Sequence, residues 1–339
     1  MKTTRSIQST GGSSLIVTLP KQWTAKNKLQ AKDKIEVIEG DNYVMMKPFG
    51  TGADYKNWRL RINAEQLTPR ELGWELEACY TCGIEEADIT NRSGLLNQMK
   101  VIREVINKLP GFEIVETSRD RTVIKNIYDQ TRLPINQATY KLLDMVIIIL
   151  GELVECLEEG DISRARDLID RDDEVDKMFR IILRQSSQTL RQENSTIQKP
   201  FEIETAHYFR GIAASLEKIA DHAVNLSRYM LQENRIQDWI NDTAPMSLLK
   251  DLANNMVREM KMILTTDKRI AYEVMEHCKL LEKRVQTLGL SRYRNKPHFS
   301  LVMASLGRMG SYFRSIAELT VDHIMWLEVS GGKKIAGRV

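Results

Sequence analysis

The sequence predicts an α+β protein of several domains: a small N-terminal β domain, a short α+β linker domain and a C-terminal all-α bundle built from duplicated three-helix units. Three observations support this class. The chain has 339 residues, which is longer than a single core usually becomes. Short β-type runs fill its first 130 residues, and long helical periodicity begins after Pro134.

The first domain, residues 1–50, is predicted from short strands separated by turn residues. Gly11-Gly12-Ser13 and Gly40-Asp41-Asn42 mark the two turns. We expect strands at 5–8, 15–19, 35–38 and 43–46, and a short helix at 21–29. So few residues bury little surface alone, and such a unit usually needs a partner chain.

Residues 51–130 alternate between strand and helix patterns, which predicts the α+β linker domain. The expected strands are 58–62, 86–90, 112–116 and 122–127, and the expected helices are 68–82 and 93–109.

The rest of the chain carries the helical bundle. The expected helices are 135–158, 161–192, 200–232, 245–267, 270–289 and 298–328. The segment Glu217 to His222 recurs as Glu318 to His323, which indicates a duplication. We therefore expect two three-helix units, 135–232 and 240–329, and a flexible tail, 330–339.

Three pairs of acids in this region are spaced four residues apart, which places both members on one helix face. The pairs are Asp172/Asp176, Glu217/Asp221 and Glu318/Asp322. Like charges at this spacing repel unless a cation lies between them. Carboxylates suit a hard cation such as Mg²⁺ or Ca²⁺, or an iron cluster if histidine joins them. Solvated helix surface is the alternative explanation.

The net charge of +3 arises at the N-terminus, where residues 1–50 carry eight Lys/Arg against four Asp/Glu. A basic domain can neutralise DNA phosphates, and a solvated lysine surface is equally compatible with the count. The candidate DNA-binding residues are Lys2, Arg5, Lys21, Lys26 and Lys28.

Several other classes are disfavoured. The longest apolar run, Met145 to Leu150, is too short for a membrane span, and the N-terminus leads into β-type sequence, so we expect a cytoplasmic protein. Cys79 and Cys82 close the expected helix 68–82 rather than lie at a helix N-terminus, and no second cysteine pair is near them, which disfavours redox or zinc chemistry. No nucleophile with its base, and no phosphate-binding Gly-rich loop, is found, so we expect no enzyme.

The segments Asp170 to Asp176 and Leu216 to Asn225 resemble the PhoU family, over about residues 135 to 328. This resemblance implies duplicated three-helix bundles, metal clusters (iron, Mg or Zn) on repeated acidic motifs, and regulation of phosphate uptake together with a phosphate transporter or its signalling proteins. By the same resemblance the ligands are Asp172, Asp176, Glu217, Asp221, Glu318 and Asp322. Gln286 departs from the family motif, so the second cluster is incomplete.

The N-terminal segment from Arg5 to Val37 is similar to the AbrB/SpoVT swapped-hairpin family. This similarity implies a homodimer through the N-terminal domain and DNA binding. The combination with a PhoU-like segment resembles archaeal phosphate-uptake regulators. We therefore expect a transcriptional regulator of phosphate homeostasis; a signalling adaptor that uses the β domain only to dimerise is one alternative, and a metal-dependent phosphohydrolase is another.

Overall fold

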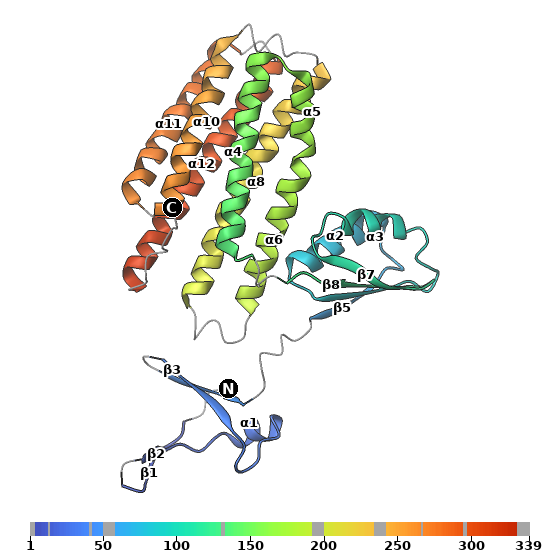
Figure 1. Cartoon of the computed structure of the whole chain (residues 1–339), viewed down its shortest axis with the longest axis vertical. Coiled ribbons are helices and arrows are strands. Elements are labelled where there is room, and N and C mark those ends of the chain that lie inside the picture. Colours follow the sequence, from blue (N-terminus) through green and yellow to red (C-terminus); the bar gives the residue numbers. More distant parts are fainter. Residues whose placement is uncertain are drawn as a thin grey trace. The chain divides into compact units, whose positions relative to one another are not determined.

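The structure is a computed structural model, and it describes residues 4–12, 14–40, 43–49, 58–129, 133–191, 200–233, 242–265, 267–293 and 297–330. The chain divides into two compact units, Met1–Asn57 and Trp58–Val339. Lys2 and the tail residues 331–339 lie outside the described part. The predicted fold class is confirmed: small strand hairpins precede a mostly helical C-terminal region (Figure 1).

Unit 1 consists of two antiparallel hairpins and one short helix. Its elements are β1 (Gln8–Thr10), β2 (Ser14–Ile16), α1 (Lys21–Lys26), β3 (Ile35–Gly40) and β4 (Tyr43–Pro48). Gly11 and Gly12 have φ of 61° and 86°, which glycine adopts without strain and which allows the tight turn between β1 and β2. None of the described residues of unit 1 is buried.

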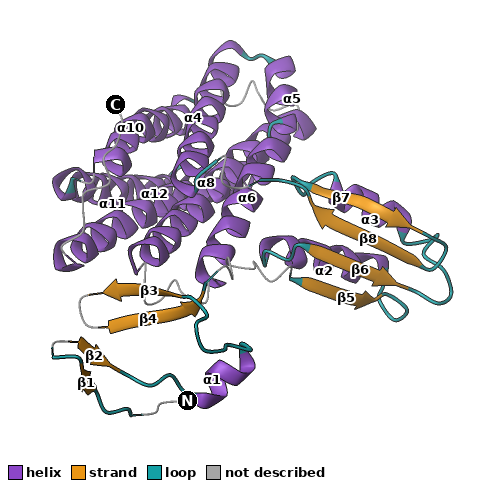
Figure 2. Cartoon of the chain, turned by 60° about the horizontal axis from the view of Figure 1, so that its bottom comes forward, coloured by secondary structure: helices purple, strands orange, loops and turns teal. Residues whose placement is uncertain are grey.

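The α/β region at the start of unit 2 is a four-stranded sheet with two helices on one face (Figure 2). Its elements are β5 (Arg59–Asn63), α2 (Pro69–Thr81), β6 (Glu86–Thr90), α3 (Met99–Ile106), β7 (Phe112–Thr117) and β8 (Arg121–Asn126). The strand order is β5-β6-β8-β7, with only β5 and β6 parallel. Leu72 and Leu76 of α2 and Ile102 of α3 are fully buried in the core of this region.

Helix α3 is shorter than the sequence predicted, because the segment before it is held as a loop. Gly94 takes a φ of 100°, outside the helical range. The side chain of Asn91 donates a hydrogen bond to Gln98 (3.0 Å), and Gln98 in turn donates to the carbonyl of Ala64 (2.7 Å). Because these tertiary contacts hold the preceding segment as a loop, the helix begins only at Met99.

The remaining elements form one helical body. They are α4 (Ile135–Glu159), α5 (Ile162–Asp170), α6 (Asp172–Arg191), α8 (Pro200–Glu233), α10 (Thr243–Thr265), α11 (Lys268–Ser291) and α12 (Pro297–Ser330). The break predicted after α4 is observed: Gly160 is left-handed (φ 68°), and the Asp161 side chain accepts hydrogen bonds from the next helix. The prediction of a single helix over 161–192 was wrong, because the segment is divided at Arg171. The guanidinium of Arg171 forms an ion pair with Glu152 of α4 (2.9 Å).

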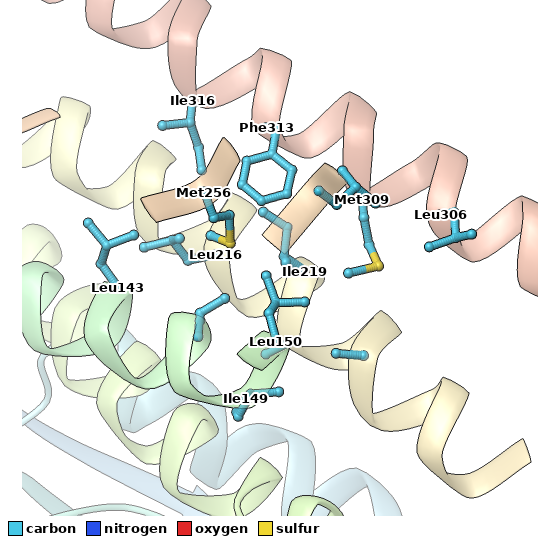
Figure 3. Close-up of a cluster of buried hydrophobic side chains, with 14 of the residues drawn as sticks. Leu143, Ile149, Leu150, Leu216, Ile219, Met256, Leu306, Met309, Phe313 and Ile316 are labelled. Atoms are coloured by element: carbon cyan, nitrogen blue, oxygen red, sulfur yellow. The ribbon is translucent and has the colours of Figure 1, made fainter. Parts of the chain in front are cut away.

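The bundle core lies between the first group of helices (α4, α5, α6, α8) and the second (α10, α11, α12). Leu216 and Ile219 of α8 meet Phe313 and Ile316 of α12 in a continuous apolar cluster (Figure 3). A Cβ at Gly211 of α8 would come within 2.8 Å of Leu319 on α12, so the two long helices approach closely there. Among the described residues, no helix is long and apolar enough to cross a membrane.

Arg184 of α6 connects the helical body to the α/β region. Its side chain is 1% exposed and donates hydrogen bonds to the carbonyls of Tyr80 (3.0 Å) and Ile84 (2.9 Å). It also pairs with the carboxylate of Glu85 at 2.6 Å. Its guanidinium carbon lies 5.4 Å from the ring centre of Phe112.

Replacing Arg184 with Met should lower the free energy of unfolding by about 3 kcal/mol or more, because two buried carbonyls and the Glu85 carboxylate each lose a charged donor. Urea unfolding followed by circular dichroism measures this loss. The matched control is Arg166→Met, at an exposed arginine of α5, which should stay within about 0.5 kcal/mol of the unchanged protein. Equal stability of the two variants would contradict the role given to Arg184.

Candidate metal centre

The structure brings three of the predicted acids together. Asp176 lies on α6, and Glu217 and Asp221 lie one turn apart on α8, which packs against α6. One carboxylate oxygen from each of the three lies within 4.8 Å of the others. We call this group the acid triad. In the part of the chain that the structure describes, it is the one group of three or more such side chains with the spacing of metal ligands.

Two cations compensate the charge of the acid triad. Lys218 Nζ lies 2.9 Å from Asp221 and 3.1 Å from Glu217 Oε2, and Arg180 lies 2.9 Å from Asp176. Three carboxylates thus face two basic groups, which leaves one negative charge in excess. This balance favours the binding of a further cation.

Glu217 is the most buried member of the acid triad, at 8% exposed. Although Lys218 is near, no hydrogen bond reaches Oε2 of Glu217 in the described structure. Burial, and then the neighbouring charge of Asp221, raise the pKa of Glu217. A metal ion bound to this oxygen would offset both effects, because it would add a second positive charge to that of Lys218.

Asp172, the fourth acid predicted for this cluster, lies outside the acid triad. Its carboxylate is bound by Arg228 of α8 at 2.8 Å. The pKa of Asp172 is raised mainly by burial, against the lowering effect of Arg228. This ion pair holds α6 against α8, so Asp172 has a structural role.

The acids of the second repeat are not gathered in the same way. Glu318 pairs with Arg314 on its own helix at 2.9 Å, and Asp322 is exposed. Glu282 accepts a hydrogen bond from Ser311 at 3.1 Å, and Gln286 is exposed on α11. The two repeats therefore differ in the arrangement of their acids.

A cleft of about 340 Å³ opens beside the acid triad. One wall belongs to α6 and α8 and includes Asp176 and Glu217. The other wall is α2, which the sequence did not connect with the acids. The complete lining is Trp74, Glu77, Ala78, Thr81, Asp176, Phe179, Arg180, Leu183 and Glu217. A cation at the acid triad would consequently be reachable from the cleft.

The two histidines that follow the acid pairs have packing roles. His323 is 1% exposed and is stacked on Tyr208, with 4.1 Å between ring centres. Neither of its ring nitrogens has a hydrogen-bond partner in the described structure. Burial lowers the pKa of His323 to about 4. His222 is half-buried and lies 6.0 Å from the ring of Tyr312.

Acidification should destabilise the protein through His323. Its folded-state pKa, about 4, lies below the ordinary value of 6.5, so the unfolded chain takes up a proton first. This contribution is complete above pH 6.5 and is lost as the pH falls toward 4. At about pH 5 the loss of stability should amount to ~2 kcal/mol.

Urea unfolding above pH 6.5 and at about pH 5 measures this loss. The proteins compared are the wild type, His323→Phe and the control His207→Gln, at an exposed histidine of α8. The phenylalanine variant should lose less stability on acidification than the wild type, and the control should follow the wild type. An unchanged loss in His323→Phe would contradict the assignment.

The N-terminal basic residues are accessible. Arg5, Lys21, Lys26 and Lys28 are all exposed, and Lys2 lies outside the described residues. Lys21 and Lys26 stand at the two ends of α1, and Lys28 follows with a φ of 54°. The exposed side chains are therefore accessible to a polyanion.

Cys79 and Cys82 show no sign of an activated pair. Cys79 is buried, and burial raises the pKa of its thiol to about 11. Cys82 is exposed at the C-terminal end of α2.

Comparison with known proteins places the acid triad within a recognised domain. Residues 139–230 match the PhoU domain. This segment covers most of α4 and α8 and all of α5 and α6, so it contains the acid triad. Residues 8–48 match the family described as antidote-toxin recognition MazE, bacterial antitoxin. The resemblance to the PhoU family inferred from the sequence is confirmed for residues 139–230, and one chain joins segments similar to these two families.

Solved structures of PhoU proteins resemble the chain in part. PhoU from Pseudomonas aeruginosa is 16% identical, with a TM-score of 0.49, over 57% of this chain and 96% of its own. The phosphate transport system regulatory protein PhoU from Streptococcus pneumoniae is 15% identical, with a TM-score of 0.44, over 58% and 94%. None of the curated proteins matches this chain in sequence.

Proposed function

We propose that this protein is a cytoplasmic, non-enzymatic regulator of phosphate uptake that binds DNA through unit 1 and a metal ion through the acid triad. The observation that carries the proposal is the position of the acid triad inside the PhoU-matching segment of a chain that also matches MazE. Phosphate uptake is inferred from the PhoU match, and DNA binding from the basic unit 1.

The metal proposal rests on the ligand set. Three carboxylates with no sulfur and no imidazole suit a hard cation such as Mg²⁺ or Ca²⁺ better than a thiolate-seeking one. An iron cluster or zinc would need additional ligands, since these ions usually take nitrogen or sulfur as well. Burial of Glu217 without a hydrogen bond on one oxygen supports a role for that atom as a ligand.

Asp176→Asn and Glu217→Gln should each weaken metal binding at least tenfold, because each removes a charged ligand. Calorimetric titration with Mg²⁺, Mn²⁺ and Zn²⁺, together with elemental analysis of the purified protein, measures the effect. Glu318→Gln is the matched control, since that acid pairs with Arg314 on its own helix. Wild-type binding in Asp176→Asn would refute a metal centre at the acid triad.

The proposal for unit 1 is that it works as a homodimer. Its apolar side chains have no core to enter: Leu15 is 70% exposed, Ile7 66% and Phe49 65%. A second copy of the same hairpins would cover these side chains, because so short a unit cannot bury them by itself. A dimer would also double the number of basic side chains that face one DNA molecule.

Changing Lys21, Lys26 and Lys28 together to Gln should weaken DNA binding and make it less sensitive to salt, because each lost phosphate contact lowers the slope of log K against log salt by about one. Gel-shift titrations against the protein's own promoters at several salt concentrations measure the slope. Lys100→Gln, at an exposed lysine of α3, is the control, and sedimentation verifies that each variant keeps its wild-type mass. No binding by the wild type, or binding without salt dependence, would instead favour a signalling adaptor whose unit 1 serves dimerisation only.

A further inference from the structure

We propose that Met275, on α11, stands where the first repeat has Asp176, and that this difference limits the chain to one metal centre. The proposal rests on the metal centre proposed above. It concerns the second repeat, whose acid pair on α12, Glu318 and Asp322, is the copy of the acid pair on α8.

Contacts at two levels fix the register of α11 against α12. Lys268, at the start of α11, donates a hydrogen bond to Glu328 near the end of α12 (2.9 Å). Glu282, further along α11, accepts one from Ser311 (3.1 Å). The two helices are therefore antiparallel. Met275 lies midway between the two α11 positions, so it comes level with about residue 320 of α12, at the acid pair.

The first repeat has an aspartate at the corresponding level. Asp172, at the start of α6, accepts a hydrogen bond from Arg228 near the end of α8 (2.8 Å). The carbonyl of Leu183, further along α6, accepts one from Arg210 (3.4 Å). Asp176 lies between these two levels and meets the acid pair of α8 there. In each repeat, therefore, one residue of the preceding helix is level with the acid pair.

The local sequences align in the same way. Glu174-Val175-Asp176 of α6 corresponds to Glu273-Val274-Met275 of α11. Val175 and Val274 are both buried, at 1% and 6% exposed, and the residue that follows each of them is half-buried. Because burial sets the rotation of each helix about its axis, Asp176 and Met275 have the same orientation in the two repeats.

Gln286, where the family motif has an acid, lies at a different level. It is about three turns beyond Met275 along α11. Its neighbour Val285 packs against Gly307 of α12, where an added Cβ would lie 3.4 Å from the valine side chain. The acid that the second repeat lacks at the level of Glu318 is therefore the one at position 275.

A methionine at this position does not suit a hard cation. The side chain of Met275 packs against the bundle core, and its thioether is a soft ligand, whereas Mg²⁺ and Ca²⁺ take oxygen. Glu318 is already paired with Arg314 on its own helix at 2.9 Å. A divalent ion at this level would thus find carboxylates on α12 and none opposite them at position 275.

Counting bound Mn²⁺ tests the proposal. Equilibrium dialysis followed by elemental analysis gives the number of ions per chain of the full-length protein, at a free Mn²⁺ concentration that saturates the wild type. The variants are Met275→Asp, the controls Met275→Leu and Gln286→Asp, and the double variant Asp176→Asn/Glu217→Gln. Each is verified as folded by circular dichroism.

The wild type should bind one Mn²⁺, and Met275→Asp should bind two, because the new carboxylate joins Glu318 and Asp322 in a second group of three acids. Met275→Leu should keep one ion, since it preserves the apolar packing without adding a ligand. Gln286→Asp should also keep one, since its carboxylate is not level with the acid pair. The double variant should lose the ion.

Two ions in the wild type, or one ion retained by the double variant, would mean that the second repeat binds a cation as it stands, and would overturn the proposal. A single ion in folded Met275→Asp would overturn it as well, while the metal centre of the first repeat would stand. No ion in the wild type would refute that metal centre and the proposal together. If Met275→Asp does not fold, Met275→Glu takes its place, since the longer side chain carries its charge closer to solvent.

Discussion

The buried guanidinium of Arg184 fixes the relation between the α/β region and the helices of unit 2. A charged side chain that is 1% exposed depends on partners within the protein, and the two terminal nitrogens of Arg184 donate to the carbonyls of Tyr80 and Ile84 and to the carboxylate of Glu85. Gln188, one turn further along α6, also donates to Glu85 at 2.8 Å. Because these donors have fixed directions, α2 is placed beside α6, and the cleft next to the acid triad follows from that placement.

One face of α6 therefore both contributes to the acid triad and holds the α/β region. Asp176, Arg180, Arg184 and Gln188 follow one another at intervals of four residues along α6, so they project from one side. The first two belong to the acid triad and its charge compensation, and the last two hold the α/β region. Binding of a cation by Asp176 would act first on its partner Arg180. Arg180 lies between Asp176 and Arg184 along the helix.

Much of this architecture could be predicted from the sequence. Five of the six expected helical segments lie within a few residues of an observed helix, and the sixth, 161–192, is divided into α5 and α6, because long apolar periodicity and breaks such as Gly160-Asp161 act locally. The late start of α3 could not be predicted, since it depends on Gln98 meeting Ala64, 34 residues away. Local pattern carries no information about such a contact.

The candidate site shows the same division. Spacing identified Asp176, Glu217 and Asp221, because residues four apart share a helix face whatever lies opposite. The partner of Asp172 could not be foreseen, since Arg228 reaches it from another helix. The contribution of α2 was missed for a similar reason: Trp74 and Glu77 are separated from Asp176 by about a hundred residues, and contacts such as those of Arg184 and Gln188 bring them near.

The absence of any buried residue in the described part of unit 1 has a consequence for the cell. A unit that gains its core only by association has no fixed stability of its own, because mass action couples its folding to the concentration of chains. For a homodimer, halving the amount of protein more than halves the amount of ordered unit 1. The level of expression would then set a threshold for this part of the molecule, while unit 2, with its own extensive core, would stay folded at any dilution.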